Sequence, residues 1–288
     1  MVKSFRQKFR IFVQMGFTAV TNGYAAGFVN GTLYKGDTKF LCVPGLNCYS
    51  CPGALGSCPI GSLQAVLSDR NHKFSFYILG FLMVFGALLG RFVCGWLCPF
   101  GLVQDLIHRI PVPRTRGNRA FGAFQKRKTL PGHRFLKWLK YAILLGFVII
   151  LPLTILDIVG QGQPWFCKYI CPSGTLFAGI PMIASHPELR SALGWLFTWK
   201  FAILIVLLIL SFFVYRPFCQ YLCPLGAVYG LFNPVALVKL RIDEEACTKC
   251  QACRRACPLD IDVWKNPNSP VCIRCGRCKD ACPHGAIH

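Results

Sequence analysis

The sequence has little charge, and very little of that charge is acidic. Only 15% of the 288 residues are charged and 54% are hydrophobic, which is too few charges for an ordinary soluble domain of this length. Eleven acidic residues stand against 32 Lys and Arg residues, and the net charge is +21. Nucleic-acid binding, basic loops of a membrane protein and bound anionic clusters would each explain this charge. Because membrane topology already accounts for the basic loops, we expect no nucleic-acid partner.

The sequence also lacks the motifs of several cofactors. It has no G-x-G-x-x-G, no P-loop and no H-E-x-x-H, so nothing in it indicates nucleotide chemistry. It has no C-x-x-C-H site for haem attachment. A bis-histidine haem within a membrane is not expected either, because all the histidines fall outside the long apolar runs: His72, His108, His133, His186, His284 and His288.

Four apolar stretches are candidates to cross a bilayer, which takes about 20 residues. They are Ile11–Val29, Phe74–Gly90, Leu139–Val159 and Trp195–Tyr215. The first is the weakest because it contains several polar residues, and a cleaved signal peptide is its alternative. Lys and Arg are concentrated at the N-terminus and in the loop after the second stretch. The positive-inside rule therefore predicts a multi-pass protein of a prokaryotic cytoplasmic membrane, with both termini cytoplasmic.

Cysteine is abundant, with 18 residues, and two runs with the same cysteine spacing lie near the C-terminus. Each run reads C-x2-C-x2-C-x3-C-P, the bacterial ferredoxin pattern, in which the fourth cysteine of one run binds the cluster of the other. One predicted [4Fe–4S] cluster is held by Cys247, Cys250, Cys253 and Cys282. The other is held by Cys272, Cys275, Cys278 and Cys257. Zinc is the alternative for C-x2-C pairs, but two complete runs that end in Cys-Pro favour iron.

A second cysteine motif follows two of the apolar stretches. Residues 91–101 and 216–226 align without a gap as R-x-x-C-x-x-L-C-P-x-G, and shorter CP-x-G elements occur at 58–61 and 171–174. The chain thus reads as two repeated hairpins with cysteines at both membrane faces. Proline is favoured at the first helical position, so each preceding cysteine is expected to be an N-cap residue. The helix N-terminus, with Arg91 or Arg216 nearby, is then expected to lower the pKa of the thiols and to hold anionic sulfur.

On the cytoplasmic face, two thiols from each half could converge on one iron–sulfur cluster. They are Cys94, Cys98, Cys219 and Cys223. Two dithiol or disulfide pairs would instead perform thiol redox chemistry, and buried cysteines that only pack are the third interpretation.

The outer face has more thiols than one cluster needs. Cys48, Cys51 and Cys58 resemble a ligand triad. The fourth ligand would come from Cys42, Cys167 or Cys171. Structural disulfides are the alternative, because the exterior is oxidising.

Electrons that reach both faces have to cross a bilayer core about 30 Å thick, which is too far for one useful tunnelling step. A quinone would fit this gap, because it needs only an apolar crevice and a few polar groups. Gln14, Asn22 and Asp157 are polar residues in or near the apolar stretches and are candidates for its contacts, with helix–helix hydrogen bonding as the alternative.

The combination of "CGWLCPFG" and "CQYLCPLG" with a double ferredoxin tail resembles the NapH/NosR/MauN-type membrane polyferredoxins. The resemblance covers most of the chain. It implies a four-span membrane electron-transfer protein with a cytoplasmic tail, which works beside a reductase or in metalloenzyme maturation. NapH-like members are associated with quinol oxidation. The extra outer motifs, "NCYSCPGALGSCPIG" and "CKYICPSG", go beyond the family's two-motif pattern and indicate an additional outer redox centre.

The sequence therefore predicts an α-helical integral membrane domain at residues 1–240 and an α+β 2[4Fe–4S] ferredoxin domain at 241–288. The expected function is electron relay between a soluble cytoplasmic carrier or reductase and the membrane, as an oxidoreductase subunit. A quinone or an outer redox partner would complete the path, in a direction that the sequence leaves open. The alternative is a redox-sensing or maturation protein that supplies electrons for assembly of an exported metalloenzyme. A cation transporter is disfavoured because charged residues deep in the spans are lacking.

Overall fold

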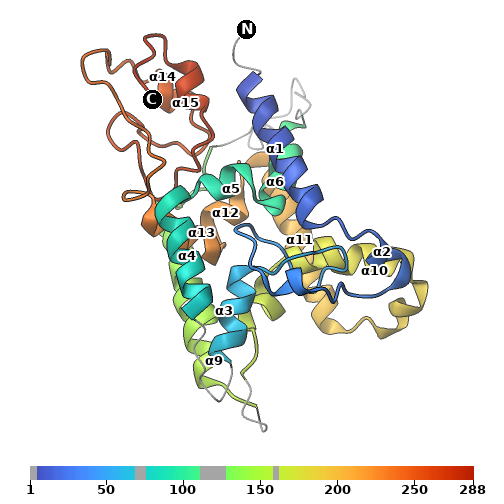
Figure 1. The fold of residues 1–288 in the computed structure, drawn as a ribbon. Coiled ribbons are helices and arrows are strands. Elements are labelled where there is room, and N and C mark those ends of the chain that lie inside the picture. The colour runs from blue at the N-terminus through green and yellow to red at the C-terminus, as the bar shows by residue number, and fades with distance from the viewer. Residues whose placement is uncertain (1–4, 69–75, 111–127, 158–161) are drawn as a thin grey trace.

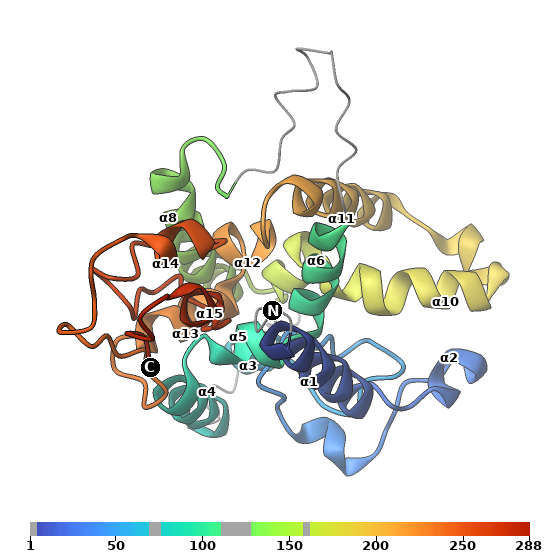
Figure 2. The same ribbon diagram turned by 90° about the horizontal axis from the view of Figure 1, so that it is seen from above.

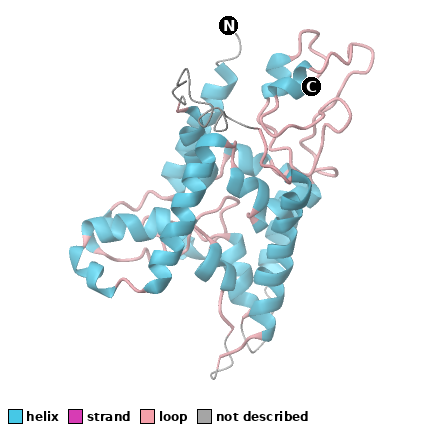
Figure 3. Cartoon of the chain, turned by 180° about the vertical axis from the view of Figure 1, so that it is seen from behind, coloured by secondary structure: helices cyan, strands magenta, loops and turns pink. Residues whose placement is uncertain are grey.

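The computed structural model describes residues 5–68, 76–110, 128–157 and 162–288. These residues are helices joined by loops (Figures 1 and 3). Pairing of the β type is limited, within the described ranges, to three isolated bridges. The first half of the chain forms α1 (Phe5–Thr21), α2 (Ala26–Asn30), the 3-10 turn η2 (Asp37–Phe40), α3 (Pro59–Leu67), α4 (Phe76–Leu89), α5 (Phe92–Trp96) and α6 (Pro99–Arg109).

The second half repeats this pattern and is followed by the tail. Its elements are α8 (His133–Ile143), the π-helical η3 (Leu144–Ile150), α9 (Leu151–Thr154), the π-turns η4 (Phe166–Ile170) and η5 (Thr175–Gly179), α10 (Ile180–Ser185), the 3-10 turn η6 (Pro187–Ala192), α11 (Trp195–Phe213), α12 (Pro217–Tyr221) and α13 (Pro224–Phe232). The tail contains α14 (Ala252–Ala256) and α15 (Arg277–Ala281).

Corresponding helices of the two halves make corresponding contacts. The first helix of each half packs on the motif of its own half: α1 on α5 and α6, and α8 on α12 and α13. The helix that leads into each motif packs on the helix that follows the other motif, so α4 lies on α13 and α11 on α6. Each half therefore packs one of its helices against the other half, next to the cysteine motifs, as the view from above shows (Figure 2).

Two helices are long and apolar enough to cross a membrane. One is the continuous helix α8–η3–α9, of 22 residues, and the other is α11, of 19 residues. Helix α4 is apolar but has only 14 residues, within the predicted span Phe74–Gly90. Four long spans are therefore not seen among the described residues. Phe74, Val159 and His72 lie outside those residues.

The predicted first span, Ile11–Val29, is not one helix. Helix α1 ends at Thr21, the chain turns, and α2 begins at Ala26. Polar side chains explain the break, because the Thr21 hydroxyl donates to Phe17 O at 2.8 Å and Asn22 Nδ2 donates to Thr18 O at 3.2 Å. Such side chains compete with the backbone at helix ends.

The predicted third span, Leu139–Val159, is shifted towards the N-terminus. Its helix begins at His133 and ends at Thr154. Pro152 lies near the end of this helix, where it removes one backbone N–H, and the preceding turns are π-helical. The proline therefore accompanies the end of the helix rather than a kink within a longer one.

The tail packs on the end of the bundle that carries α5 (Figure 1). Trp96 Nε1 donates to Arg274 O at 3.1 Å, and Arg274 Nη1 donates to Leu89 O at 2.7 Å. Within the tail, Arg241 and His288 exchange two backbone hydrogen bonds and Ile242 forms a bridge with Ile287. This pairing is too short to make a strand, so the expected α+β fold is reduced to helical turns and loops in the described residues.

Candidate metal centres

The four inner cysteines are buried where the two motifs meet. Cys94, Cys98, Cys219 and Cys223 each expose between 5% and 6% of their surface. Both motifs form the same turn, because the Cys98 N–H donates to Val93 O at 3.1 Å and the Cys223 N–H donates to Phe218 O at 3.0 Å. The structure thus brings the four predicted inner residues into one place, from both halves of the chain.

The prediction that cysteines cap the helices that follow them is confirmed. Cys58, Cys98 and Cys223 are the N-cap residues of α3, α6 and α13, and proline begins each helix. At the fourth element, Cys171 ends η4 and precedes Pro172, after which the chain is again helical.

The two motif arginines each bind the opposite motif. Arg216 Nη1 donates to the carbonyl oxygen of Cys94. Arg91 Nη2 donates to the carbonyl oxygen of Cys219 at 2.7 Å. The motif glycines make room for these contacts: a Cβ on Gly101 would lie 3.0 Å from Arg216 Nη1, and one on Gly226 would lie 3.0 Å from Arg91 Nη2. The arginine of each motif therefore contacts the first cysteine and the glycine of the other motif.

These arginines bind backbone carbonyls, and burial of the thiols outweighs their expected effect on the thiol pKa. Burial raises the pKa of Cys219 to about 12, more than Arg216 lowers it. Burial likewise raises the pKa of Cys223 well above its ordinary value, and the neighbouring Cys219 and Cys94 add to the rise. The expectation of lowered pKa values is wrong for these two thiols, because desolvation disfavours the anion. A bound cation is then what would keep them as thiolates.

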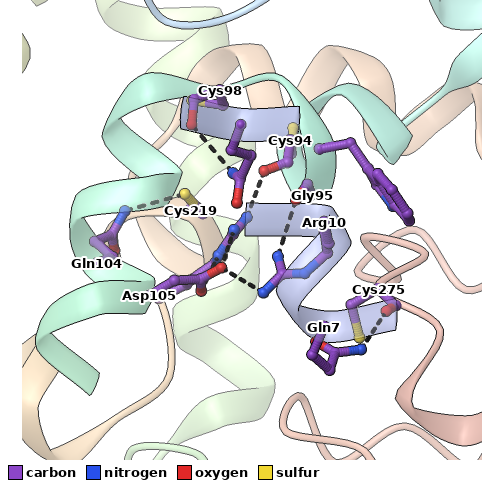
Figure 4. A network of polar contacts seen from close by, with 12 residues as sticks. Gln7, Arg10, Cys94, Gly95, Cys98, Gln104, Asp105, Cys219 and Cys275 are labelled. Carbon is purple, nitrogen blue, oxygen red and sulfur yellow. Dashed lines mark hydrogen bonds and ion pairs between the residues drawn. The ribbon is translucent and has the colours of Figure 1, made fainter. Parts of the chain in front are cut away.

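A buried ion-pair cluster, which the sequence reasoning missed, supports the inner site (Figure 4). Asp105 on α6 lies 2.6 Å from Arg216 Nη2 and 2.7 Å from Arg10 Nη2 on α1. Arg10 also donates to Gly95 O at 2.9 Å. Burial alone would raise the pKa of Asp105, but the two guanidinium groups hold it well below its usual range. The only sequence signal was a lone acidic residue in a basic region.

Two further buried cations lack such a partner. Arg91 and Lys140 are both 1% exposed, and no carboxylate pairs with either of them among the residues that the structure describes. Arg91 Nε has no hydrogen-bond partner, and Lys140 Nζ lies 5.0 Å from the centre of the Tyr141 ring. Around the inner thiols, the three buried arginines Arg10, Arg91 and Arg216 thus face one carboxylate, which leaves a surplus of positive charge.

Gln104 binds the inner site from the first half. Its Nε2 donates to Cys219 Sγ at 3.2 Å (Figure 4). Its Oε1 accepts from the Phe218 N–H at 3.2 Å. The sequence did contain a signal for it. "CPFGLVQ" and "CPIGSLQ" place Gln104 and Gln64 at the same distance from their Cys-Pro pairs.

Each predicted tail set lines its own small cavity. Cys247, Cys250, Cys253 and Cys282 line one, and Cys257, Cys272, Cys275 and Cys278 line the other. In both, three cysteines of one run meet the last cysteine of the other, as the ferredoxin pattern requires. The iron content of each set stays a prediction.

The second tail set lies next to the inner site. Asn233 connects them, because its Nδ2 donates to Cys272 O at 2.8 Å while its Oδ1 accepts from the Arg91 N–H at 2.9 Å. Gln7 Nε2 on α1 donates to Cys275 O at 2.9 Å. The first tail set is farther out and includes the exposed Cys250. We call them the proximal and the distal tail set.

The outer cysteines divide differently from the prediction. Cys48, Cys58, Cys167 and Cys171 line one cavity of about 620 Å³. Cys51, predicted as a ligand with Cys48 and Cys58, instead donates from its thiol to Phe177 O at 3.2 Å and is not among the residues lining the cavity. Cys42 Sγ lies 3.7 Å from the hydroxyl oxygens of Ser57 and Ser62. None of the 18 cysteines, all of which lie in the described ranges, forms a disulfide.

The three polar candidates for quinone contacts have separate roles. Gln14 is fully buried and its Nε2 donates to Cys98 O at 3.3 Å. Asn22 ends α1, and the exposed Asp157 accepts a hydrogen bond from Gln163 Nε2 at 2.9 Å. The structure does not bring these residues together.

None of the described His, Cys, Asp and Glu side chains form a group of three or more that could hold a single metal ion. Thiolates around one zinc would lie roughly 4 Å apart, because each Zn–S bond is about 2.3 Å. A four-iron cluster needs thiols around a space instead. In the tail and at the outer face, the thiols of each set line such a space.

Comparisons with known proteins agree with this chemistry. The 4Fe–4S binding domain family matches residues 57–77, 72–119, 139–183 and 196–242, and a second 4Fe–4S binding domain family matches 240–261 and 268–288. No solved structure matches the chain.

Several curated proteins are similar along the chain. The uncharacterized protein MJ0750 of Methanocaldococcus jannaschii is 31% identical, over 63% of this chain and 64% of its own length. The putative electron transport protein YccM of Escherichia coli is 29% identical, over 67% of this chain and 48% of its own length. The ferredoxin-type protein NapH of Haemophilus influenzae is 28% identical, over 65% of this chain and 54% of its own length. The chain thus spans less than two thirds of each relative. With the first family matching more than half of the chain, it belongs to the 4Fe–4S binding domain family, as a polyferredoxin of the NapH/MauN type.

Proposed function

We propose that the protein relays electrons through iron–sulfur clusters between a soluble cytoplasmic carrier or reductase and the membrane. Electrons enter or leave at the distal tail set, which is the more exposed. They pass through the proximal tail set to the inner cysteines. Asn233 supports this order, because it touches both the Cys272 carbonyl and the backbone of Arg91.

The surplus of buried positive charge is the main observation that supports a cluster at the inner cysteines. An isolated buried cation is costly unless an anion balances it. Arg91 and Lys140 have no carboxylate in the described residues, yet both lie at the inner thiols. A [4Fe–4S] cluster held by four thiolates has net negative charge and would balance them. In such a site the cluster supplies one-electron transfer, while the protein fixes its charge environment.

The surface of the apolar helices supports a membrane location. Large apolar side chains of α4 and α11 are exposed, among them Met83 at 52%, Val206 at 55% and Ile209 at 55%. Such a surface is unfavourable in water and suits lipid. The tail would face the cytoplasm. A quinone, or a membrane or extracytoplasmic partner, would exchange electrons at the far end of the relay.

Iron counting tests the proposal. The full chain is purified anaerobically in detergent, and iron, sulfide and the EPR spectrum are measured. The double variant Cys94→Ser/Cys219→Ser should lose about four iron atoms per chain, the content of one cluster, while the tail signals persist. Cys42→Ser is the matched control and should lose none. Unchanged iron in the double variant would refute an inner cluster.

A further inference from the structure

The outer cavity has the construction of a second cluster site within the bundle. We infer that Cys48, Cys58, Cys167 and Cys171 ligate a [4Fe–4S] cluster, and that Cys42 and Cys51 do not take part. The inference rests on the proposed function in one respect, since the outer cluster would extend the same relay. Its first support is placement: these four thiols, from two loops more than a hundred residues apart in sequence, line a single cavity.

The second support is that the outer site repeats the inner one. The Cys171 N–H donates to Phe166 O at 2.9 Å, which is the same five-residue turn that the inner motifs form at Cys98 and Cys223. Gln64 makes the same two hydrogen bonds at the outer site that Gln104 makes at the inner site. Its Nε2 donates to Cys167 Sγ at 3.4 Å and its Oε1 accepts from the Phe166 N–H at 3.1 Å.

The glycines of the outer CP-x-G elements face the thiols of the opposite loop. A Cβ on Gly174 would lie 3.1 Å from Cys48 Sγ, and a Cβ on Gly61 would lie 3.8 Å from Cys167 Sγ. Each loop therefore lies against the other's sulfur, and a side chain at position 174 would crowd Cys48 Sγ. If the cysteines of each loop had only a packing role within that loop, these close contacts between the glycine of one loop and the sulfur of the other would not be needed.

The outer site also carries positive charge without a matching carboxylate. Lys200 Nζ donates to Cys167 O at 3.2 Å, in the way that Arg91 donates to Cys219 O. Lys39, 4% exposed, donates to Ala54 O at 2.8 Å, and both lysines line the cavity. Neither forms an ion pair with a carboxylate among the described residues. An anionic cluster would supply the balancing charge.

The excluded cysteines are held by other groups. Cys51 is 1% exposed, its thiol donates to Phe177 O, and it packs with Ala54 and Ala178. Cys42 lies among serine hydroxyls. This gives a matched pair of double variants, one inside the set and one outside it.

The experiment compares Cys58→Ser/Cys171→Ser with Cys42→Ser/Cys51→Ser in the anaerobically purified full chain. The first should lose about four iron atoms and one EPR component, as for one four-iron cluster, and the second should lose neither. Equal iron in both variants and the wild type would overturn the inference. So would a wild-type chain in which thiol alkylation under denaturing conditions shows the four outer cysteines joined as disulfides.

Two further readouts keep the outcome interpretable. The ferredoxin signals of the tail report folding, and loss of those signals in the wild type would instead refute the proposed function. Should the cysteine double variant fail to accumulate, Gln64→Leu serves in its place. It removes one hydrogen bond to Cys167 Sγ and should shift the outer EPR signal or its potential while the iron content stays the same. No change in any cluster signal of Gln64→Leu counts against the inference.

Discussion

The guanidinium of Arg91 donates a hydrogen bond to the carbonyl oxygen of Cys219 at 2.7 Å, across 128 positions of sequence. Its counterpart Arg216 binds Cys94 O in the same way. The contact ties the turn that presents one half's thiols to the start of the other half's motif. Positions of all four inner thiols therefore depend on both arginines.

Gly226→Ala tests this exchange. The added Cβ would lie 3.0 Å from Arg91 Nη2 and 3.3 Å from Cys219 O, so the hydrogen bond between them should break. A bond to a charged donor is worth about 1.5–3 kcal/mol, and we expect a lower Tm and a weakened inner EPR signal. Gly80→Ala is the control, since nothing lies within 4 Å of its Cβ. Equal behaviour of the two variants would contradict the role given to Arg91.

Asp105→Asn should destabilise the protein by about 3–5 kcal/mol, because it leaves two buried guanidinium groups without their carboxylate. Asp280→Asn removes the partly exposed pair with Arg6 and should cost at most about 1 kcal/mol. Thermal unfolding in detergent measures both. Because the pKa of Asp105 is lowered, its contribution is present above the unfolded pKa of about 3.9 and is lost only as the pH falls. The difference in Tm should thus be constant between about pH 6 and pH 8.

Gln104→Leu should make the inner cluster harder to reduce. Hydrogen bonds to sulfur stabilise the more negative reduced state, and Gln104 provides one to Cys219 Sγ. If that bond is about 1.4 kcal/mol stronger in the reduced state, its loss lowers the potential by roughly 60 mV. EPR-monitored redox titration measures this. Gln64→Leu is the comparison, because its bond goes to Cys167 and should leave the inner signal in place.

Gly95→Ala should loosen the tail from the bundle. A Cβ there would lie 2.3 Å from the carbonyl oxygen of Ile273, and backbone cannot yield to it without moving the tail. Limited proteolysis should release the tail faster than from the wild type, while both tail signals survive. Unchanged protection would show that Gly95 does not define the docking surface.

Chelator or mild oxidant should remove the distal cluster first. Its set includes the exposed Cys250, whereas Cys257, Cys272, Cys275 and Cys278 are all buried. Iron loss followed with EPR should therefore show two phases, with about four iron atoms in the first, the content of one cluster. A first phase that spared the distal signal would contradict the assigned order of the relay.

Local spacing predicted the parts of the sites that neighbouring residues determine. The C-x2-C-x2-C-x3-C-P runs predicted which tail cysteines meet, because short loops can wrap a cluster in few ways. The Cys-Pro pairs predicted the N-caps. The ligand role of Cys51 stays a prediction; in the structure the chain turns between Cys48 and Cys51, and the Cys51 thiol donates to Phe177 O.

Features that depend on long-range packing were not predictable. Arg10 and Asp105 meet only because α1 lies on α6, and a composition count cannot show that. The direction of the thiol pKa shifts was wrong for the same reason: helix termini and arginines are visible in sequence, but complete burial of Cys219 is not. The predicted length of the first span was wrong, because side-chain hydrogen bonds end its helix at Thr21.

The reciprocal arginine contacts have a consequence for the symmetry of the bundle. In a two-fold homodimer, residue i of one copy touches residue j of the other, and j touches i in return. Arg91 with Cys219, and Arg216 with Cys94, follow that rule within a single polypeptide. The bundle thus contains, within one chain, the reciprocal contacts of a two-fold symmetric dimer. Asp105 has Gly230 at its counterpart position, so the two-fold symmetry does not extend to the buried ion pairs of Asp105.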